Sequence, residues 1–391
     1  MSLIPRISIH DYDYNLPDFR IAKYPVVPKH DSKLLIYDNG DIYHSTFLHL
    51  SEYLHQEEVL LVNNTKVIPA RLWFEKSDGV RIQIFLLKPV SHDWSLWHVM
   101  VGNRRRFKFD DILQVSNEQG LLDVKWENRN ENIIKLESAG PSIPEWIELL
   151  GEIPLPPYLN RLAEDRDKTD YQAIFAKNKG AVAAPTASLH FTPELLQRLR
   201  EKNIGQLEAT LHVGAGTFKP VSVDFVDEHE MHTEQFEIST SLLEDLLGRT
   251  SGTIALGTTA CRILESLPLL GAKIILGEMD EVFISTEDAY REDIRAISTR
   301  EALHALHQYI ISVGGTLRGE TQIFMLPGFN FRLTSGMITN FHQPKSTLML
   351  LVAAFVGDVW KDIYSTALSN NYRFLSYGDG SLLRGKKNIQ W

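Results

Sequence analysis

The hydrophobic pattern of this chain changes its period near residue 68, and that change constrains the fold more than any other feature. From Ile68 to Leu136, short runs of alternating apolar and polar residues follow one another, separated by turn-forming residues. These runs cover residues 80–87, 94–101, 112–115, 121–126 and 133–136. Several short strands at such close spacing are typical of a small antiparallel barrel or sandwich. We therefore predict an inserted antiparallel all-β domain, a barrel or a sandwich, over residues 67–148.

The segments on either side of this region carry a different pattern. Val59–Val62 predicts a buried strand, because four apolar residues precede the turn-prone pair Asn63-Asn64. Beyond the proline-rich connector at 154–157, helical patterns alternate with strand-like ones. Thr192-Pro193 is typical of a helix N-terminus, and Thr299–Ile311 has a helical pattern. Residues 1–66 and 149–391 are therefore expected to form one discontinuous, mixed α/β domain.

Composition excludes several classes of protein. The most apolar stretch of the 391 residues, Leu348–Val356, is much shorter than the ~18 residues that a membrane span needs. The first residues show no basic segment leading into an apolar one, so we expect no secretion and no membrane partner. Cys261 is the single cysteine, which excludes a disulfide framework and a Cys-based zinc site. The sequence thus predicts a cytoplasmic protein.

The charge of the chain limits how it can bind a polyanion. Forty Lys and Arg residues against fifty Asp and Glu residues give a net charge of −10, whereas an indiscriminate nucleic-acid binder usually has the opposite sign. Binding of RNA therefore requires local basic patches, although each such patch could equally be a solvated face. The main candidates for RNA binding are Arg104, Arg105, Arg106 and Lys108. Two further patches are Arg198, Arg200 and Lys202, and Arg384, Lys386 and Lys387.

Two segments combine small or glycine residues with polar side chains. Residues 182–192 lie directly before the predicted helix N-terminus, where free N–H groups and the positive helix end favour an anion. The alternative is a tight loop that uses small residues for close packing. In the second segment, 210–218, Gly214 and Gly216 would let the backbone approach a ligand. A dinucleotide fingerprint needs a third glycine where Lys219 stands, so a nicotinamide-binding fold is poorly supported.

Two further segments place polar residues next to buried elements. In 256–266, an apolar strand ends in Gly257-Thr258-Thr259 and leads into a helix, an arrangement with which α/β proteins hold ligands. Arg262 and Glu265 on this helix could also form a plain ion pair. In 338–347, five polar or ionisable side chains precede a wholly apolar element, which is costly unless a ligand or a network satisfies them. The pair His229 and His232 does not have zinc-protease spacing, and we expect no metal.

Taken in order, these segments resemble the S-adenosylmethionine:tRNA ribosyltransferase-isomerase (QueA) family across nearly the whole chain. The resemblance is carried by Asn-Asn-Thr-Lys-Val-Ile-Pro-Ala-Arg-Leu (63–72), Leu-Pro-Pro-Tyr (155–158), Gly-Ala-Val-Ala-Ala-Pro-Thr-Ala (180–187), Leu-His-Phe (189–191), Leu-His-Val-Gly-Ala-Gly-Thr-Phe (211–218), Met-His with Glu234 (231–234), Gly-Thr-Thr (257–259), Leu-Glu-Ser (264–266), Thr-Asn-Phe-His (339–342), Pro-Lys-Ser-Thr-Leu (344–348), Tyr-Arg-Phe (372–374) and Ser-Tyr-Gly-Asp (376–379).

The resemblance implies an activity as well as the α/β fold with an inserted β-barrel. Such an enzyme moves the ribosyl unit of S-adenosylmethionine onto 7-aminomethyl-7-deazaguanine at the wobble position of tRNA and isomerises it. The product is epoxyqueuosine, and adenine and methionine leave. S-adenosylmethionine is then a consumed substrate rather than a cofactor. The implied partner is a tRNA with a GUN-type anticodon loop that carries the modified base.

The implied chemistry assigns tasks to particular side chains. Proton transfer suits a histidine, and His190, His212 and His342 are the catalytic candidates. Phe218, Phe341 or Tyr377 could offer an aromatic face to the sulfonium. The residues expected to bind substrate are Arg71, Pro185, Thr186, Gly214, Gly216, Thr217, Thr258, Thr259, Arg262, Asn340, Lys345, Tyr377 and Asp379.

The chain departs from the family pattern in four places. Lys66 stands where arginine is common, Ser188 where glycine is usual, and Gln343 where leucine is usual, and the stretch 268–320 is longer than the ordinary connection. These departures leave open a paralogue that acts on a related nucleobase or RNA. The sequence is also compatible with a non-catalytic relative that binds RNA, and with a nucleotide-dependent oxidoreductase built on the Gly214 and Gly216 turn.

Overall fold

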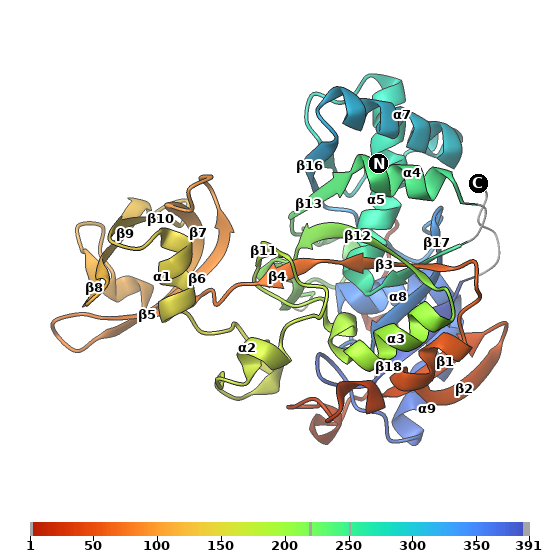
Figure 1. Cartoon of the computed structure of the whole chain (residues 1–391), viewed down its shortest axis with the longest axis horizontal. Coiled ribbons are helices and arrows are strands. Elements are labelled where there is room, and N and C mark those ends of the chain that lie inside the picture. Colours follow the sequence, from red (N-terminus) through yellow and green to blue (C-terminus); the bar gives the residue numbers. More distant parts are fainter. Residues whose placement is uncertain (1–2, 219–220, 250–251, 386–391) are drawn as a thin grey trace.

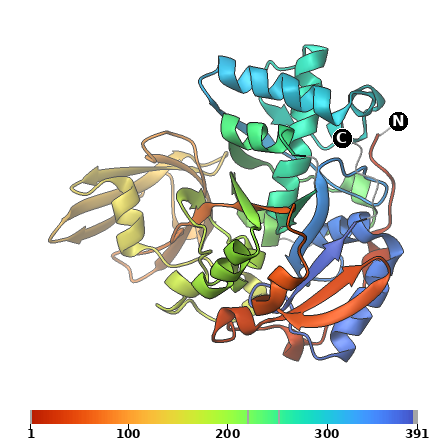
Figure 2. The ribbon, with the colours of Figure 1, turned by 45° about the vertical axis from the view of Figure 1, so that its right-hand side comes forward.

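The computed structural model describes residues 3–218, 221–249 and 252–385. A large mixed α/β part contains both the N-terminal and the C-terminal segments of the chain, and a smaller β part lies beside it (Figure 1). The strands of the smaller part come from one continuous stretch, drawn in orange and yellow, whereas the large part combines segments from before and after that stretch (Figure 2). The chain is therefore a mixed α/β protein with an insertion.

A ten-stranded mixed sheet forms the centre of the large part. Its strand order is β15-β16-β13-β12-β3-β14-β17-β18-β1-β2. The four central strands, β12, β3, β14 and β17, run parallel to one another, while both flanks contain antiparallel pairs. The bounds are β1 (Lys33–Asp38), β2 (Asp41–Thr46), β3 (Val59–Asn63), β12 (Gly205–His212), β13 (Glu234–Ser239), β14 (Thr253–Leu256), β15 (Phe283–Ile284), β16 (Thr316–Thr321), β17 (Thr334–Asn340) and β18 (Gly380–Arg384).

The central strands are apolar on both faces because helices cover both faces. Leu61, Ala255 and Met337 point into one hydrophobic core, which the helices after residue 240 complete. Their neighbours Leu60 and Ile338 point into a second core on the opposite face. Parallel strands that are buried on both sides read as continuous apolar runs, which explains why Val59–Val62 could be identified from the sequence alone.

The helices mostly confirm the helical patterns of the sequence. The N-terminus predicted at Thr192-Pro193 is that of α3, where the Thr192 hydroxyl accepts the Leu195 N–H. The pattern at Thr299–Ile311 is α7, with Ser298 and Glu301 forming a capping box. The bounds are α2 (Asp167–Asp170), α3 (Pro193–Glu201), α4 (Thr240–Leu247), α5 (Thr258–Leu276), α6 (Glu292–Ala296), α7 (Thr299–Ser312), α8 (Thr347–Val356) and α9 (Trp360–Ser369).

The inserted part is a six-stranded antiparallel sheet with the order β5-β6-β7-β10-β9-β8, closed off by helix α1 (Ile143–Leu150). Its bounds are β5 (Arg71–Glu75), β6 (Arg81–Pro89), β7 (Leu96–Gly102), β8 (Leu113–Asn117), β9 (Gly120–Asn128) and β10 (Ile133–Ala139), so each predicted run holds a strand. Within these fully described residues, no hydrogen-bonded ladder joins the outer strands β5 and β8. The antiparallel sheet is confirmed, and its closure into a barrel stays a prediction.

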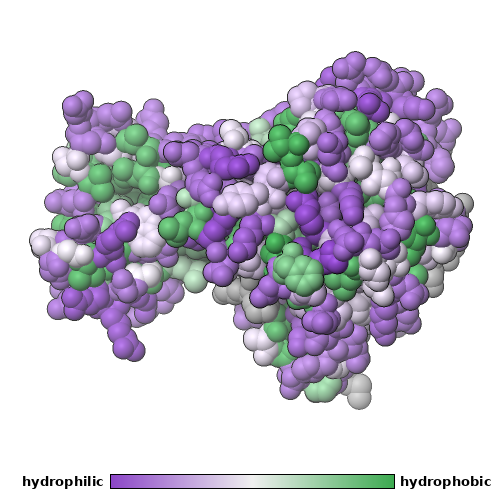
Figure 3. Space-filling view, turned by 90° about the horizontal axis from the view of Figure 1, so that it is seen from below, coloured by the Kyte–Doolittle hydropathy of each residue, from purple (hydrophilic) through white to green (hydrophobic). Residues whose placement is uncertain are grey.

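Several contacts join the two parts. The short parallel pair β4 (Thr65–Val67) and β11 (Asn178–Ala181) lies where the chain enters and leaves the insertion. Val182 packs into the core of the inserted sheet, and Lys88 on β6 forms an ion pair of 2.5 Å with Glu320 on β16. In the space-filling view, a narrower waist separates the two parts of a mainly hydrophilic surface (Figure 3). None of the helices in the described residues is long and apolar enough to cross a membrane.

Candidate active site

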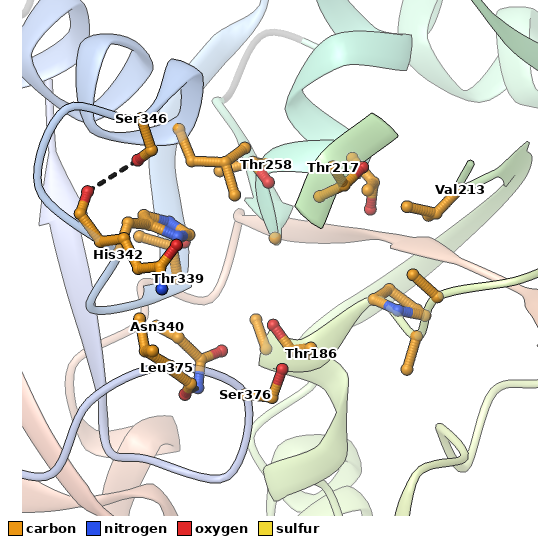
Figure 4. Close-up of a pocket in the computed structure, with 18 of the residues that line it drawn as sticks. Thr186, Val213, Thr217, Thr258, Thr339, Asn340, His342, Ser346, Leu375 and Ser376 are labelled. Atoms are coloured by element: carbon orange, nitrogen blue, oxygen red, sulfur yellow. Dashed lines mark hydrogen bonds between the residues drawn. The ribbon is translucent and has the colours of Figure 1, made fainter. Parts of the chain in front are cut away.

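A cavity of about 700 Å³, including its open mouth, lies at the carboxyl ends of the central parallel strands. The loops that follow β12, β14 and β17 meet there, together with the 3-10 helix η7 (Thr186–His190) and the turn at Leu375-Ser376. Figure 4 shows Thr217 and Thr258 on one side of the space, and Thr186 and Ser376 on another. This edge of a parallel sheet is the usual ligand site of open α/β folds.

The cavity brings together residues from four of the segments that the sequence singled out. Of the predicted residues, it is lined by Pro185, Thr186, Thr217, Thr258, Thr259, Asn340 and His342. Sequence reasoning missed Tyr158, Tyr171, Thr339, Ser346, Leu375 and Ser376 as cavity residues. Tyr158 and Ser376 belong to segments that carry the family resemblance, and they join in a hydrogen bond of 2.6 Å. Tyr171 carries no comparable signal, and only the fold brings it here.

The N-terminus of α5 opens into this cavity. Gly257 precedes it with φ +90°, a conformation that favours glycine, and no side chain caps the first N–H groups of the helix. Thr258 and Thr259 form the first helical positions and both line the cavity. The hydroxyl of Thr259 is buried and has no hydrogen-bond partner within the described residues. Free N–H groups, the positive helix end and a spare hydroxyl together suit a carboxylate.

Asn340 presents a hydrogen-bond acceptor to the cavity. Its amide nitrogen donates to the backbone oxygen of Leu375 and to Nε2 of His190, each at 3.1 Å, and these two bonds fix the orientation of the amide. The amide oxygen therefore points the other way and finds no partner in the described part of the chain. Leu375 holds its carbonyl in place with φ +68°, which is rare for a residue of this kind. A ligand with an N–H group fits this oxygen.

Of the three predicted catalytic histidines, His342 lines the cavity. Its Nε2 lies 2.8 Å from the hydroxyl of Thr339, and its backbone is held by Tyr364 and Tyr14, whose hydroxyl groups bond its N–H and its carbonyl. Burial lowers the pKa of His342 to about 3, because the charged form loses its hydration. At neutral pH the imidazole is therefore uncharged and able to accept a proton.

The other two histidines do not line the cavity. His190 stacks on Phe47, with 4.1 Å between ring centroids, and accepts the hydrogen bond from Asn340. Burial lowers its pKa to about 3, and it positions the amide. His212, at the end of β12, shares a hydrogen bond of 2.8 Å with Thr65 and packs its ring against Gly180. Burial also lowers the pKa of His212. Neither ring lines the cavity.

Four residues expected to bind substrate engage other parts of the protein. Arg71 lies on β5 of the inserted sheet, where its backbone pairs with Glu152. Lys345 forms an ion pair of 2.9 Å with Asp13. The remaining two have structural partners near the C-terminal turn: Tyr377 donates to Asp167, and Asp379 accepts the backbone N–H groups of Lys33 and Arg373.

The structure also changes which aromatic rings are candidates to contact a sulfonium. Phe341 is enclosed by the rings of Tyr364, Tyr372 and Phe374 and does not reach the cavity. The side chain of Phe218 lies outside the part of the chain that the structure describes. Tyr158 and Tyr171 are the aromatic rings in the cavity wall.

The glycine turn after β12 serves a polar network. A side chain at Gly216 would come within 2.6 Å of the His232 ring, so this glycine allows His232 to pack closely. The network contains Glu234, which lies 3.3 Å from Nε2 of His232 and forms an ion pair with Arg262. Arg262 thus pairs with Glu234 and not with Glu265, whose carboxylate accepts the backbone N–H groups of Arg332, Leu333 and Thr334.

The candidate RNA-binding residues are exposed on the inserted part. Arg104, Arg105 and Arg106 form the 3-10 turn η5 between β7 and β8, and Lys108 follows it. The Arg106 guanidinium lies 3.7 Å from Asp78. Elsewhere, Arg198 lies near Glu194, Arg384 forms a buried ion pair with Glu58, and Lys386 and Lys387 fall outside the described residues. Within the described ranges, no three His, Cys, Asp or Glu side chains form a cluster suited to a metal ion.

Comparison with known proteins agrees with these features. The family model described as "Queuosine biosynthesis protein" matches residues 9–383, which is nearly the whole chain. The chain belongs to the queuosine biosynthesis protein family. The resemblance read from the sequence is thereby confirmed.

Members of the queuosine biosynthesis protein family with high similarity are named S-adenosylmethionine:tRNA ribosyltransferase-isomerase. The relative from Halothermothrix orenii is 37% identical over 385 residues, covering 96% of this chain and 100% of the relative. The relative from Chlorobium luteolum is 38% identical over 384 residues, with the same two coverages. The crystal structure of S-adenosylmethionine tRNA ribosyltransferase from Thermotoga maritima aligns with 95% of this chain and 99% of its own, at 26% identity and a TM-score of 0.47.

Two departures from the usual pattern of this family have a clear structural setting. Gln343, which stands in place of a leucine, lines the cavity. Ser188, in place of a glycine, is fully buried in η7, and its backbone lies outside the left-handed region that would require glycine. Its hydroxyl has no hydrogen-bond partner among the described residues. The serine is therefore accommodated without backbone strain, and Gln343 is the departure that can touch a ligand.

Proposed function

We propose that this chain is an S-adenosylmethionine:tRNA ribosyltransferase-isomerase. It transfers the ribosyl unit of S-adenosylmethionine to 7-aminomethyl-7-deazaguanine at the wobble position of tRNA, and it isomerises that unit to give epoxyqueuosine. Adenine and methionine are released, so S-adenosylmethionine is consumed as a substrate. The observation that carries the proposal is one cavity in which an uncapped helix N-terminus, a neutral histidine and a fixed amide oxygen converge.

The cavity supplies groups that complement a sulfonium nucleoside. Its wall carries hydroxyl, amide and imidazole groups together with aromatic rings. The N-terminus of α5, with Thr258 and Thr259, suits the methionine carboxylate. The rings of Tyr158 and Tyr171 suit the sulfonium, because an aromatic face attracts a cation.

His342 is the group best placed to move a proton. The reaction removes a proton from the ribose 5′ carbon, which the adjacent sulfonium makes acidic. His342 is uncharged at neutral pH, so a ring nitrogen has a free lone pair for this proton, and its low pKa makes it a weaker base than an ordinary histidine. Once protonated in a site that disfavours its charge, it is a strong acid that can return the proton to the departing adenine. The electron pair of the broken glycosidic bond stays on adenine, and the histidine is regenerated.

The nucleobase substrate enters the same cavity as an extruded residue. A base in an anticodon loop is single-stranded and can be splayed out, stacked and read on its polar edge. The amide oxygen of Asn340 accepts from a base N–H, and Thr186 offers a hydroxyl nearby. We propose that the partner is a tRNA with a GUN-type anticodon loop. Part of the tRNA backbone would contact Arg104, Arg105, Arg106 and Lys108, because these cations are exposed.

The domain division is part of the proposal. Residues 67–148 form the inserted domain, a small β-barrel, and residues 1–66 and 149–391 form the catalytic domain. In support, one hydrophobic core joins buried residues of 68–147, and Val182 is its one fully buried member from outside that range among the described residues. The cavity belongs to the catalytic domain, since its lining residues begin at Tyr158.

Incubation of the enzyme with S-adenosylmethionine and tRNA that carries 7-aminomethyl-7-deazaguanine tests the function directly. Mass spectrometry of the digested tRNA should show epoxyqueuosine, and chromatography should show adenine in equal amount. A matched tRNA with unmodified guanine at the wobble position is the control and should give neither. Binding of both substrates without adenine release would identify a non-catalytic relative and overturn the proposal.

Gln343 favours one second candidate, a paralogue that acts on a related nucleobase. A side-chain amide in the cavity wall can hydrogen-bond a polar substituent that a leucine cannot. The same mass-spectrometric experiment distinguishes the two, because a paralogue would leave 7-aminomethyl-7-deazaguanine unchanged. If the chain does convert 7-aminomethyl-7-deazaguanine, Gln343→Leu should leave that conversion unaffected.

A further inference from the structure

The side chain of Thr217 is the cavity end of a buried network that contains His232, Glu234 and Arg262. The Thr217 hydroxyl lies 3.4 Å from Oε1 of Glu234 and 3.5 Å from Nε2 of His232. Nε2 of His232 lies 3.3 Å from the same carboxylate oxygen, and Arg262 bonds the other one. Glu234 is 1% exposed, so this carboxylate sits in the protein interior, directly behind the cavity wall.

The charge state of Glu234 fixes the direction of each hydrogen bond in the network. Burial alone would raise the pKa of Glu234, but the charge of Arg262, the contact with His232 and the backbone N–H of Gly214 outweigh burial, so the pKa lies below its usual value. An ionised carboxylate only accepts hydrogen bonds. His232 and Thr217 must therefore both donate to it, and the lone pairs of the Thr217 oxygen are left for the cavity.

The network also joins Thr217 to the first turn of α5. Arg262 follows Thr258 by four residues, so both lie on the same face of that helix, and Arg262 holds the carboxylate that Thr217 contacts. Thr217 and Thr258 both line the cavity (Figure 4). One side of the cavity thus combines an acceptor backed by a buried anion with a helix N-terminus and the unpartnered, buried hydroxyl of Thr259.

We propose that this side of the cavity is a clamp for the zwitterionic α-amino acid end of the sulfonium substrate. The N–H groups of α5 and the Thr259 hydroxyl hold the carboxylate, and Thr217 accepts from the neighbouring ammonium. Glu234 is the positioning residue that turns the Thr217 oxygen toward the ammonium, and His232 and Arg262 hold Glu234 in place. This inference rests on the proposed function, because it assigns one end of the same substrate.

An amino acid carries its ammonium and its carboxylate on the same carbon, so its binding site needs an acceptor and an anion site close together. Thr217 and the first residues of α5 line the same cavity, and the Glu234–Arg262 ion pair connects them. Adenine and the ribose present no fixed positive charge, and they would gain less from an oxygen backed by Glu234. The clamp therefore predicts that the amino acid end, rather than the nucleoside, depends on Thr217.

Calorimetric titration with three ligands separates these contributions. S-adenosylmethionine and S-adenosylhomocysteine contain the amino acid end, and 5′-methylthioadenosine lacks it. Thr217→Val, which keeps the shape and removes the hydroxyl, should weaken binding of the first two about tenfold or more, as expected for a hydrogen bond to a charged group. It should leave the affinity for 5′-methylthioadenosine within about twofold of the parent value, which corresponds to about 0.4 kcal/mol. Thr217→Ser, which restores the hydroxyl, should return the affinity of S-adenosylmethionine to near the parent value.

Glu234→Gln tests the positioning role, since an amide can donate to Thr217 and turn its proton toward the cavity. This variant should show the same ligand-selective loss, and the double variant with Thr217→Val should lose no more than Thr217→Val alone. If Glu234→Gln does not fold, the Thr217 pair of variants still decides. Equal loss for all three ligands, or no loss for any, overturns the clamp. If the parent protein binds none of the three ligands, the proposed function itself fails.

Discussion

The inserted part and the large part differ in whether their interiors contain buried polar residues. The core of the inserted sheet is apolar throughout: within residues 68–150, all of which are described, no polar or charged residue is buried. The large part buries ionised and polar groups near its cavity, among them Glu234, Arg262, His190 and Asn340. Buried polar groups cost free energy unless they are hydrogen-bonded, and here most are bonded to one another.

This difference indicates where function resides. The inserted part is stabilised mainly by packing, and the polar atoms that it buries, such as Nε of Arg71 and of Arg129, belong to side chains that are not buried as a whole. At the cavity of the large part, Thr259 Oγ1 and Asn340 Oδ1 have no hydrogen-bond partner among the described residues, so both atoms are available to bind a ligand. We therefore expect changes in the inserted part to affect stability or RNA binding, and changes in the large part to affect turnover.

The largest expected effect follows from His342→Gln in the cavity. Adenine release should fall by about 10²- to 10⁴-fold, because the proton-transfer group is lost. S-adenosylmethionine binding, measured by calorimetry, should change little. The matched control is His98→Gln on β7 of the inserted sheet, which should keep parental turnover. Full activity of His342→Gln would remove His342 from the mechanism and weaken the contrast between the two parts.

A pair of matched substitutions, each of which creates a cavity in one of the two cores, tests whether the two parts are energetically distinct. Ile84 of the inserted sheet and Ile254 of the large sheet are both fully buried, and replacement of either by alanine should cost about 2–5 kcal/mol of unfolding free energy. Ile84→Ala should leave the dissociation constant of S-adenosylmethionine unchanged. Ile254→Ala should weaken binding, since Ile254 lies on β14, which leads directly into the α5 N-terminus. An equal effect of both variants on S-adenosylmethionine would refute the division.

Acid should destabilise the large part first. His190 and His342 have folded pKa values of about 3, whereas an unfolded histidine titrates near 6.5, so between these values the unfolded chain binds more protons. Stability therefore falls as the pH drops below 6.5, by about 2 kcal/mol per histidine at pH 5. His190→Gln should remove part of this pH dependence.

Tryptophan fluorescence can follow the two parts separately during acid unfolding. Five of the seven tryptophans lie in the inserted part, namely Trp73, Trp94, Trp97, Trp126 and Trp146. We expect far-ultraviolet circular dichroism to change at a higher pH than the fluorescence does. Coincident transitions by both probes at all pH values would show that the parts unfold as one unit.

The smallest expected effect concerns the basic turn of the inserted part. Arg104→Ala combined with Arg105→Ala should lower tRNA affinity and reduce the slope of log affinity against log salt concentration by about 1 to 2, as for two neutralised phosphates. Calorimetric binding of S-adenosylmethionine alone should be unchanged. Arg300→Ala with Lys361→Ala, at exposed positions on α7 and α9, is the control for loss of surface charge. If the double variant of Arg104 and Arg105 keeps the parental affinity and slope, the RNA must contact another part of the protein.

The hydrophobic pattern predicted the elements well because it reports local geometry. The alternating runs of 80–136 each hold a strand, and Thr192 and Thr299 mark the first turns of α3 and α7. The residue type at the cavity was equally informative for Thr258, Asn340 and His342, since polar residues before apolar elements need partners. The same reasoning could not show which of the three histidines lines the cavity, because the burial of a side chain depends on neighbours that are distant in sequence.

Arg262 and the two glycines show most clearly what the sequence leaves open. The spacing of Arg262 from Glu265 suggested a helical ion pair, yet Glu265 accepts three backbone N–H groups and Arg262 pairs with Glu234 on β13. Gly214 and Gly216 suggested close approach to a ligand, whereas Gly216 gives room to His232 and the N–H of Gly214 reaches Glu234. Such pairings arise across strands and helices, where spacing along the chain carries no information.

The sequence by itself determined the insertion of an antiparallel sheet into a mixed α/β chain, and its ordered motifs determined the family. Those properties follow from periodicity and residue type, which are written along the chain. The tertiary structure alone decided that His342 lines the cavity while His190 and His212 do not, and that Tyr171 joins the cavity wall. Folding brings together segments more than a hundred residues apart, and only that assembly sets which atoms lose water and which stay unpaired for a ligand.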